Sequence, residues 1–150
     1  MSGIALRTAI AVIFAFHGIG QLMGVIAALK LFGAGGTSGP AWLQGWSAQS
    51  WLFDNLAGST AARVIGAILF LAASIGFIAS VLALQGWLVP HEWWRTLAIA
   101  AAVISLIAIS LYWNALIFLF PHKLGNIGVN LGVLLCLLLI HWPSEADIGF

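Results

Sequence analysis

The chain alternates between long apolar stretches and shorter links that carry its polar residues and most of its tryptophans. Crossing a hydrocarbon core of about 30 Å takes roughly 20 mostly apolar residues in a helix. Four windows meet this need and are apolar around their whole circumference, without the alternation of a membrane β-strand. The windows are residues 5–31, 61–84, 96–120 and 125–142. The pattern predicts an all-α fold, a four-transmembrane-helix antiparallel bundle that forms one integral membrane domain over residues 1–150, because short links make sequential helices antiparallel neighbours.

Composition excludes the main water-soluble classes. The 150 residues are 63% hydrophobic and only 6% charged, whereas a soluble domain averages about 25% charged residues. The formal net charge of +1 does not indicate a positively charged surface that would bind nucleic acid. The one cysteine, Cys136, excludes an intrachain disulfide and any multi-cysteine metal site. We therefore expect membrane lipids as partners and no nucleic acid.

The link between the first two windows, from about Phe32 to Thr60, is the only long one and is rich in tryptophan. It opens with a glycine-rich run and continues with aromatic and polar residues in alternation, a mixture that suits the membrane–water boundary. Two interpretations stay open: an interfacial anchor, and a lid over a pocket in the bundle. The expected interfacial anchors here and elsewhere are Trp42, Trp46, Trp51, Trp87, Trp93, Trp94 and Trp142.

Membrane orientation follows only weakly from the charges. One side of the predicted bundle carries Arg7 and Arg95, and the other carries Lys30, Arg63 and Lys123, so the positive-inside rule does not decide. The glycine- and tryptophan-rich long link favours export. We therefore expect a multi-pass protein of a prokaryotic cytoplasmic membrane with cytoplasmic termini.

Small residues recur at intervals of three or four within the windows. Helices in a bilayer associate by close packing at such residues, because lipid tails are as apolar as leucine. The glycines predicted to serve helix packing are Gly20, Gly24, Gly76, Gly128 and Gly132.

Polar residues at membrane depth are the most informative feature, since hydrocarbon offers them no partner. At 1.5 Å per residue the buried polar groups gather in the half of the bundle that faces the long link. One interpretation is interhelical hydrogen bonding, with Gln21 or His17 paired to Asn130 and Asn114 paired to Asn126. The other is a polar pocket that takes the head group of a quinone or lipid. The candidate pocket residues are His17, Gln21, Asn114, Asn126, Asn130 and, at the boundary, Lys123.

His17 raises the question of a haem or a metal ion. A bis-histidine haem needs a second histidine at the same depth, and His91, His122 and His141 lie in links or at a helix end. No window carries an embedded carboxylate that would complete a metal site. The sequence therefore predicts neither haem nor metal.

The first window resembles the opening helix of the DoxX-like group of small four-helix membrane proteins. In that group an arginine, a phenylalanine seven residues on, a glycine four beyond it and a lysine three further recur. Arg7, Phe14 and Gly18 match, and Gln21 stands where the lysine would be. The four-window plan fits the group over the whole chain. The resemblance implies a range of roles, among them a small subunit of thiosulfate:quinone oxidoreductase and assembly of other membrane proteins.

The sequence contains no nucleophile–base pair, phosphate loop, acid dyad or redox cysteine pair. It therefore favours a non-catalytic accessory or assembly subunit of a larger membrane complex of redox or electron-transfer type, with other integral membrane subunits as partners. The alternative is the small membrane subunit of a quinone-linked oxidoreductase, with a quinone or lipid in the polar pocket. The short polar tail, residues 144–150, is expected to rest either on a partner or on its own bundle.

Overall fold

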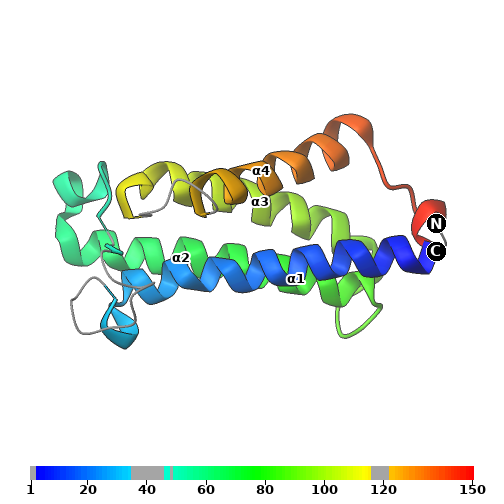
Figure 1. Cartoon of the computed structure of the whole chain (residues 1–150), viewed down its shortest axis with the longest axis horizontal. Helices are drawn as coiled ribbons and strands as arrows, with labels where there is room; N and C mark the ends of the chain where they lie inside the picture. The colour runs from blue at the N-terminus through cyan, green and yellow to red at the C-terminus, as the bar shows by residue number, and fades with distance from the viewer. Residues whose placement is uncertain (1–2, 35–45, 48, 116–121) are drawn as a thin grey trace.

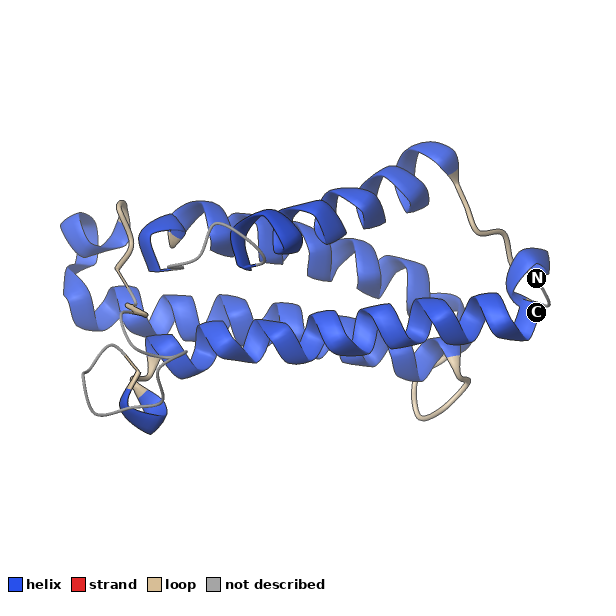
Figure 2. Ribbon diagram, viewed as in Figure 1, coloured by secondary structure: helices blue, strands red, loops and turns tan. Residues whose placement is uncertain are grey.

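The structure is a computed structural model that describes residues 3–34, 46–47, 49–115 and 122–150. Within these residues it is all-helical and contains no strand (Figure 2). Its helices are α1 (Gly3–Ala28), α2 (Phe53–Leu84), α3 (Trp94–Leu111) and α4 (Leu124–Leu134), the last continued by a π-helical segment over Leu135–Ile140. The predicted all-α character of the fold is confirmed for the described residues.

Three helical stretches are long and apolar enough to cross a membrane: Gly3–Ala28, Phe53–Leu84 and His91–Leu111. The stretch Leu124–Ile140 is also apolar but shorter. In hydrocarbon a helix satisfies all of its backbone polar groups internally, which is why such sequences form helices. The first three predicted windows therefore correspond to membrane-span-like helices.

Three windows end earlier than predicted, the fourth at Ile140 instead of residue 142. The first window was expected to run to residue 31, but α1 ends at Ala28 because Lys30 adopts a left-handed conformation, with φ 54°. The third window was expected to run to residue 120, but α3 ends at Leu111. Tyr112 has a φ of −113° and a ψ of 33°, which takes the backbone out of the helix. Residues 116–120 of that window lie outside the described residues.

Helix α2 begins eight residues before the predicted window. It is kinked at Gly58, whose φ of 81° and ψ of 161° would be strained for any other residue. Beyond the kink the helix continues to Leu84, the predicted end of the window.

The helices lie side by side with a weak seam between the first and the last (Figure 1). Helix α1 packs along α2, α2 along α3, and α3 along α4, whereas α1 and α4 scarcely touch. Both chain ends lie at the same end of the bundle (Figure 1). The arrangement is therefore open along the seam between α1 and α4.

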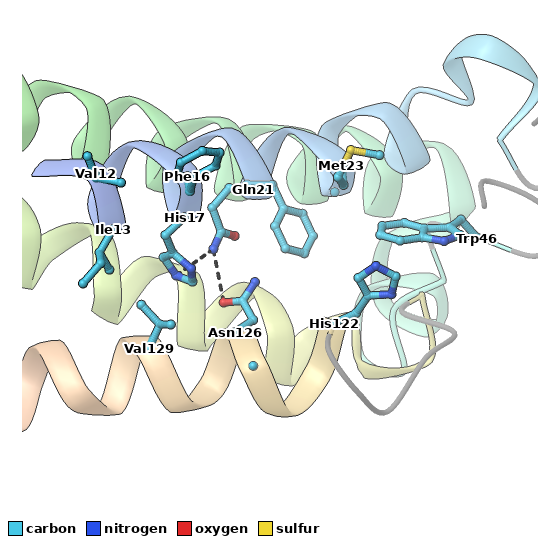
Figure 3. Close-up of a pocket in the computed structure, with 14 residues that line it drawn as sticks. Val12, Ile13, Phe16, His17, Gln21, Met23, Trp46, His122, Asn126 and Val129 are labelled. Carbon is cyan, nitrogen blue, oxygen red and sulfur yellow. Dashed lines mark hydrogen bonds between the residues drawn. The ribbon is translucent and has the colours of Figure 1, made fainter. Parts of the chain in front are cut away.

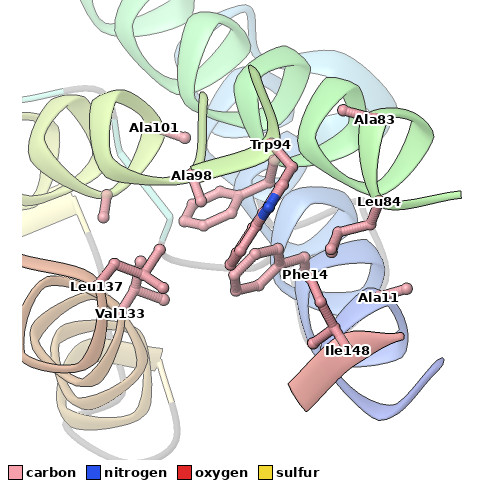
Figure 4. Close-up of a cluster of buried hydrophobic side chains, with 12 residues drawn as sticks. Ala11, Phe14, Ala83, Leu84, Trp94, Ala98, Ala101, Val133, Leu137 and Ile148 are labelled. Carbon is pink, nitrogen blue, oxygen red and sulfur yellow. The ribbon is translucent and has the colours of Figure 1, made fainter. Parts of the chain in front are cut away.

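Two hydrophobic clusters hold the bundle, one toward each end. The first surrounds Phe14, Phe77 and Trp94 and includes Ile148 from the C-terminal tail (Figure 4). The second contains Trp46, Phe70 and Tyr112. The Tyr112 hydroxyl donates to the carbonyl of Ala62 in α2, which joins the end of α3 to α2.

The C-terminal tail rests on the chain's own bundle, which was one of the two expectations for it. Ile148 is fully buried, and a methyl group added at Gly3 would lie 2.8 Å from the Gly149 nitrogen. Glu145 is hydrogen-bonded by His91 at 2.6 Å and by the Trp94 indole at 3.2 Å. Helix α1 and the turn before α3 together form the surface on which the tail lies.

The tryptophans separate into exposed and buried groups. Trp51, Trp87, Trp93 and Trp142 are 45–62% exposed, as expected of rings at a membrane boundary, and Trp42 lies outside the described residues. The anchor prediction is wrong for Trp46 and Trp94, which are 2% and 0% exposed. Both rings fill the interior, and the Trp94 N–H reaches Glu145 instead of water.

The five glycines predicted to serve helix packing fall into two groups. A Cβ at Gly24 would clash with the Phe70 ring, and one at Gly76 would lie 2.8 Å from the Ala101 Cβ, so both glycines permit close packing. The same atom at Gly20, Gly128 or Gly132 would meet no described atom within 4 Å. The packing prediction is therefore wrong for these three within the described chain, because Gly20 and Gly132 line cavities between α1 and α4 and Gly128 is exposed.

Candidate functional site

A cavity of about 630 Å³ lies in the seam between α1 and α4 (Figure 3). Helix α1 supplies one wall with residues spaced three or four apart, α4 supplies the other, and Phe70 of α2 forms part of the lining. His17, Gln21 and Asn126 are its polar lining at membrane depth. Three of the six candidate pocket residues therefore line one cavity directly.

His17 and Gln21 lie one turn apart on α1, on the face that looks toward α4. The His17 Nε2 and the Asn130 Oδ1 are 3.1 Å apart. The Gln21 Nε2 donates to the Asn126 Oδ1 at 3.1 Å and lies 3.3 Å from the His17 Nε2. Polar side chains therefore bridge the seam. The pairing of His17 with Asn130 matches one of the pairs expected from depth, whereas Gln21 bonds Asn126.

Asn126 is the centre of this network. Besides Gln21, its Oδ1 accepts from the Ser105 hydroxyl at 3.1 Å and from the Asn130 amide at 2.7 Å. The Asn130 amide also donates to the Ser105 oxygen at 2.8 Å. Ser105 lies on α3, so the network joins three helices.

The Gln21 carboxamide oxygen has no hydrogen-bond partner among the described residues. The side chain is only 1% exposed, and a buried acceptor left unpaired costs about 1–3 kcal/mol. Figure 3 shows this oxygen turned away from His17 and Asn126, toward the side of the cavity where Trp46 and His122 lie. Gln21 lines the cavity, and its unpaired oxygen is buried in the cavity wall.

The main bonds of the network can run in either of two directions. With the proton on the His17 Nε2, donors run from His17 through Asn130 to Asn126. If the three carboxamides rotate by half a turn and His17 carries its proton on Nδ1, the His17–Asn130 and Gln21–Asn126 bonds form with donors and acceptors exchanged. The two Asn126 N–H groups then serve only two of the three partners that its oxygen has. Gln21 then presents N–H groups to the cavity instead of an oxygen. The site can therefore bond either a hydroxyl or a carbonyl.

Trp46 and His122 close the end of the cavity near the long link. Their rings meet edge to face, with centroids 5.0 Å apart. The Trp46 indole N–H is buried without a hydrogen-bond partner among the described residues, and burial lowers the pKa of His122 below its ordinary value. Trp46 thus lies where the lid interpretation of the long link places it.

Two of the predicted pocket residues lie elsewhere. Asn114 is exposed in the short turn Trp113–Ala115 that follows α3, so its predicted pairing with Asn126 is wrong. The Lys123 ammonium lies 4.6 Å from the centre of the Trp113 ring, and Lys123 does not line the cavity. None of the described lining residues is Asp, Glu, Lys or Arg.

Sequence reasoning missed His122, Phe70 and Ser105 as parts of the site and considered Trp46 only as part of a lid. The depth argument placed His122 in a link, yet it lines the same cavity as His17. A serine on the third window is a weak signal by itself. The described residues contain no group of three or more His, Cys, Asp or Glu side chains arranged to hold a metal ion.

No family model, no curated protein and no solved structure matches the chain.

Proposed function

We propose that the chain binds a quinone or lipid by its head group in the cavity between α1 and α4, as the small membrane subunit of a quinone-linked redox complex. The observation that carries this proposal is the buried Gln21 oxygen, unpartnered among the described residues, in the wall of a cavity of about 630 Å³. Ligand sites combine an apolar lining with a few convergent polar groups, and this cavity has that composition.

The reversible amide network supports a quinone-type head group in particular. A quinone presents a carbonyl that needs a donor, and its reduced form presents a hydroxyl that needs an acceptor. Gln21 can offer either, because Asn126 and Asn130 can reverse with it. The same site therefore serves both redox states of one ligand without a charged side chain.

The proposal places the chain in a prokaryotic cytoplasmic membrane as an antiparallel bundle of four spans with cytoplasmic termini. Leu124–Ile140 is then the fourth span, with the π-helical end reaching the boundary near Trp142. The DoxX-like resemblance of Arg7, Phe14 and Gly18 agrees with this plan, and the glutamine at position 21 departs from it where the group has a lysine.

Quinone titration tests the proposal. Decylubiquinone and decylubiquinol are added to the protein in lipid nanodiscs, and quenching of tryptophan fluorescence reports binding. We expect saturable binding of both, weakened about tenfold by Gln21→Leu, which removes a hydrogen bond of about 1.4 kcal/mol. Gln85→Leu is the matched control, because Gln85 lines neither cavity. Absence of saturable binding, or equal affinities in the two variants, would contradict the proposal.

A second candidate function is an accessory or assembly role without a ligand. One observation favours it: Gly128 is exposed, a Cβ added there would meet no described atom of another element within 4 Å, and glycine faces of this kind form contacts between membrane helices. On this candidate, purification in mild detergent brings out a larger membrane partner with the chain, and Gly128→Leu releases it. Recovery of the wild-type chain alone would contradict the accessory role.

A further inference from the structure

A second cavity of about 230 Å³ lies farther along the same seam, toward the chain ends. Its described lining is almost entirely apolar and includes Phe14 of α1 and Gly132 and Cys136 of the fourth helix. It contains none of the amides that characterise the first cavity. The two cavities thus differ in chemistry, one having a polar wall and the other none.

The two cavities are neighbours in one seam. Ile13 of α1 and Val129 of α4 line both of them, and Figure 3 shows these two side chains beside His17. The backbones of α1 and α4 stay apart along this seam, and side chains cross it through the His17–Asn130 and Gln21–Asn126 hydrogen bonds.

Glycines keep this seam open. Gly20 lines the first cavity and Gly132 the second, and a Cβ at either position would meet no described atom within 4 Å. A larger side chain at these positions would occupy the cavity itself. Gly20 and Gly132 therefore leave space between α1 and α4 that a larger side chain would fill.

The charge of the ligand follows from the lining. Neither cavity has an Asp, Glu, Lys or Arg among its described lining residues. An ionic head group at this depth would be unpaired in a medium of low dielectric, which costs several kcal/mol. A neutral head group meets no such penalty.

We propose that the two cavities form one binding slot for a neutral amphiphile with a single apolar chain. Its hydroxyl or carbonyl bonds Gln21, and its chain runs past Ile13 and Val129 to end beside Cys136. This inference rests on the proposed function for the head group and adds the position of the tail, the direction in which it runs and the neutrality of the head.

Cys136 gives a direct readout of the tail, because it is the only cysteine of the chain. The rate of its modification by N-ethylmaleimide is measured by mass spectrometry of the protein in nanodiscs. Decylubiquinol has a tail, and duroquinol has a quinol head without one. We expect decylubiquinol to slow modification about tenfold at saturation and duroquinol to leave the rate unchanged.

Filling the second cavity provides a variant test. Gly132→Leu places a side chain in the space assigned to the tail and should weaken decylubiquinol binding about tenfold, the effect of a misfit of one or two methylenes in an apolar pocket, with no change for duroquinol. Gly128→Leu is the matched control, one turn away on the same helix and outside both cavities.

Head-group charge and ligand source are tested with a second pair of probes that share one acyl chain. Monodecanoylglycerol is neutral and hydroxylated, and the corresponding lysophosphatidic acid is anionic. We expect only the neutral lipid to protect Cys136. Stronger protection by decylubiquinol assigns the slot to quinols, and stronger protection by monodecanoylglycerol assigns it to neutral glycerolipids.

The possible failures are distinguishable. If no quinone or lipid binds, the proposed function itself fails. If duroquinol and decylubiquinol bind equally and neither protects Cys136, the head-group site stands and the tail slot is overturned. Equal protection by the anionic lipid overturns the neutrality of the head. Protection of Cys136 by a co-purified protein chain, unchanged by decylubiquinol, would assign the seam to a partner helix and overturn the slot as well.

Discussion

The ring of Phe150, at the C-terminal end, stacks on the imidazole of His91 with the two centroids 3.5 Å apart and the planes inclined by 25°. The Arg7 guanidinium lies 4.5 Å from the centre of the same phenyl ring. The tail thus joins the beginning of α1 to the turn before α3. This end of the bundle is therefore closed by residues far apart in sequence, while the seam between α1 and α4 stays open.

Burial of Ile148 should anchor the tail. We expect Ile148→Ala to lower the free energy of unfolding by roughly 2–5 kcal/mol, because it removes a fully buried side chain from the Phe14–Trp94 cluster. Thermal unfolding in detergent is the measurement. Leu139→Ala, at a site that is 74% exposed, is the control and should change little. Equal midpoints for the two variants would show that the tail does not pack on the bundle.

Acid should loosen the same tail through Glu145. Burial raises the pKa of this carboxyl, but hydrogen bonds from His91 and Trp94 and the charges of His91 and Arg95 outweigh it, so the pKa lies below its ordinary 4.5. Its contribution to stability is therefore complete above about pH 4.5 and is lost as the pH falls through the lowered value. Because the side chain is half exposed, that contribution is about 0.2–1 kcal/mol.

The Glu145→Gln variant checks this sign. It should be less stable than wild type near neutral pH, and the difference between the two should vanish at the acid end of a series of thermal unfolding curves. Glu92→Gln removes the same charge from the turn before α3, where Glu92 is exposed, and should leave the curve unchanged. A constant difference between Glu145→Gln and wild type at every pH would contradict the assignment.

Depth along each helix identified the polar cluster from the sequence but not its pairing. His17, Gln21, Asn126 and Asn130 do meet, because residues at similar depth on helices of one bundle face each other across it. Asn126 and Asn130 are one turn apart on the same face, so a small axial shift decides which of them Gln21 reaches. That shift depends on packing between α3 and α4, which no residue pattern encodes. Asn114 fails for another reason, since α3 ends three residues before it.

A double-mutant cycle should reveal the pairing. We expect Gln21→Leu and Asn126→Leu to be coupled by about 0.6 kcal/mol in stability, the average for hydrogen bonds between membrane helices. Asn126→Leu should be the costliest single change in the network, since its oxygen accepts three hydrogen bonds. The wild-type chain, the two single variants and the double variant are compared by thermal unfolding in the same detergent. Strict additivity would mean that Gln21 and Asn126 are not in contact.

Glycine spacing was equally ambiguous. A repeat of three or four residues indicates that Gly128 and Gly132 share a stripe, but not whether that stripe faces a helix, a cavity or lipid. Gly76 packs against Ala101, whereas Gly132 lines the second cavity and Gly128 lies on an open face. Which of these a glycine faces depends on how the helix is rotated about its own axis. The sequence of a helix that is apolar on all sides does not predict that rotation.

The same substitution at two glycines tests this distinction. At Gly76 a Cβ would lie 2.8 Å from the Ala101 Cβ and 3.4 Å from its Cα, so relief requires the α2 and α3 backbones to move apart. We expect Gly76→Leu to destabilise the isolated chain by about 1–3 kcal/mol. A Cβ at Gly128 would meet no described atom within 4 Å, and we expect Gly128→Leu to change stability by less than about 0.5 kcal/mol. Thermal unfolding in detergent compares the two variants. Equal losses would mean that α4 packs against another helix through its Gly128 face after all, and the open face assigned to Gly128 would have to be abandoned.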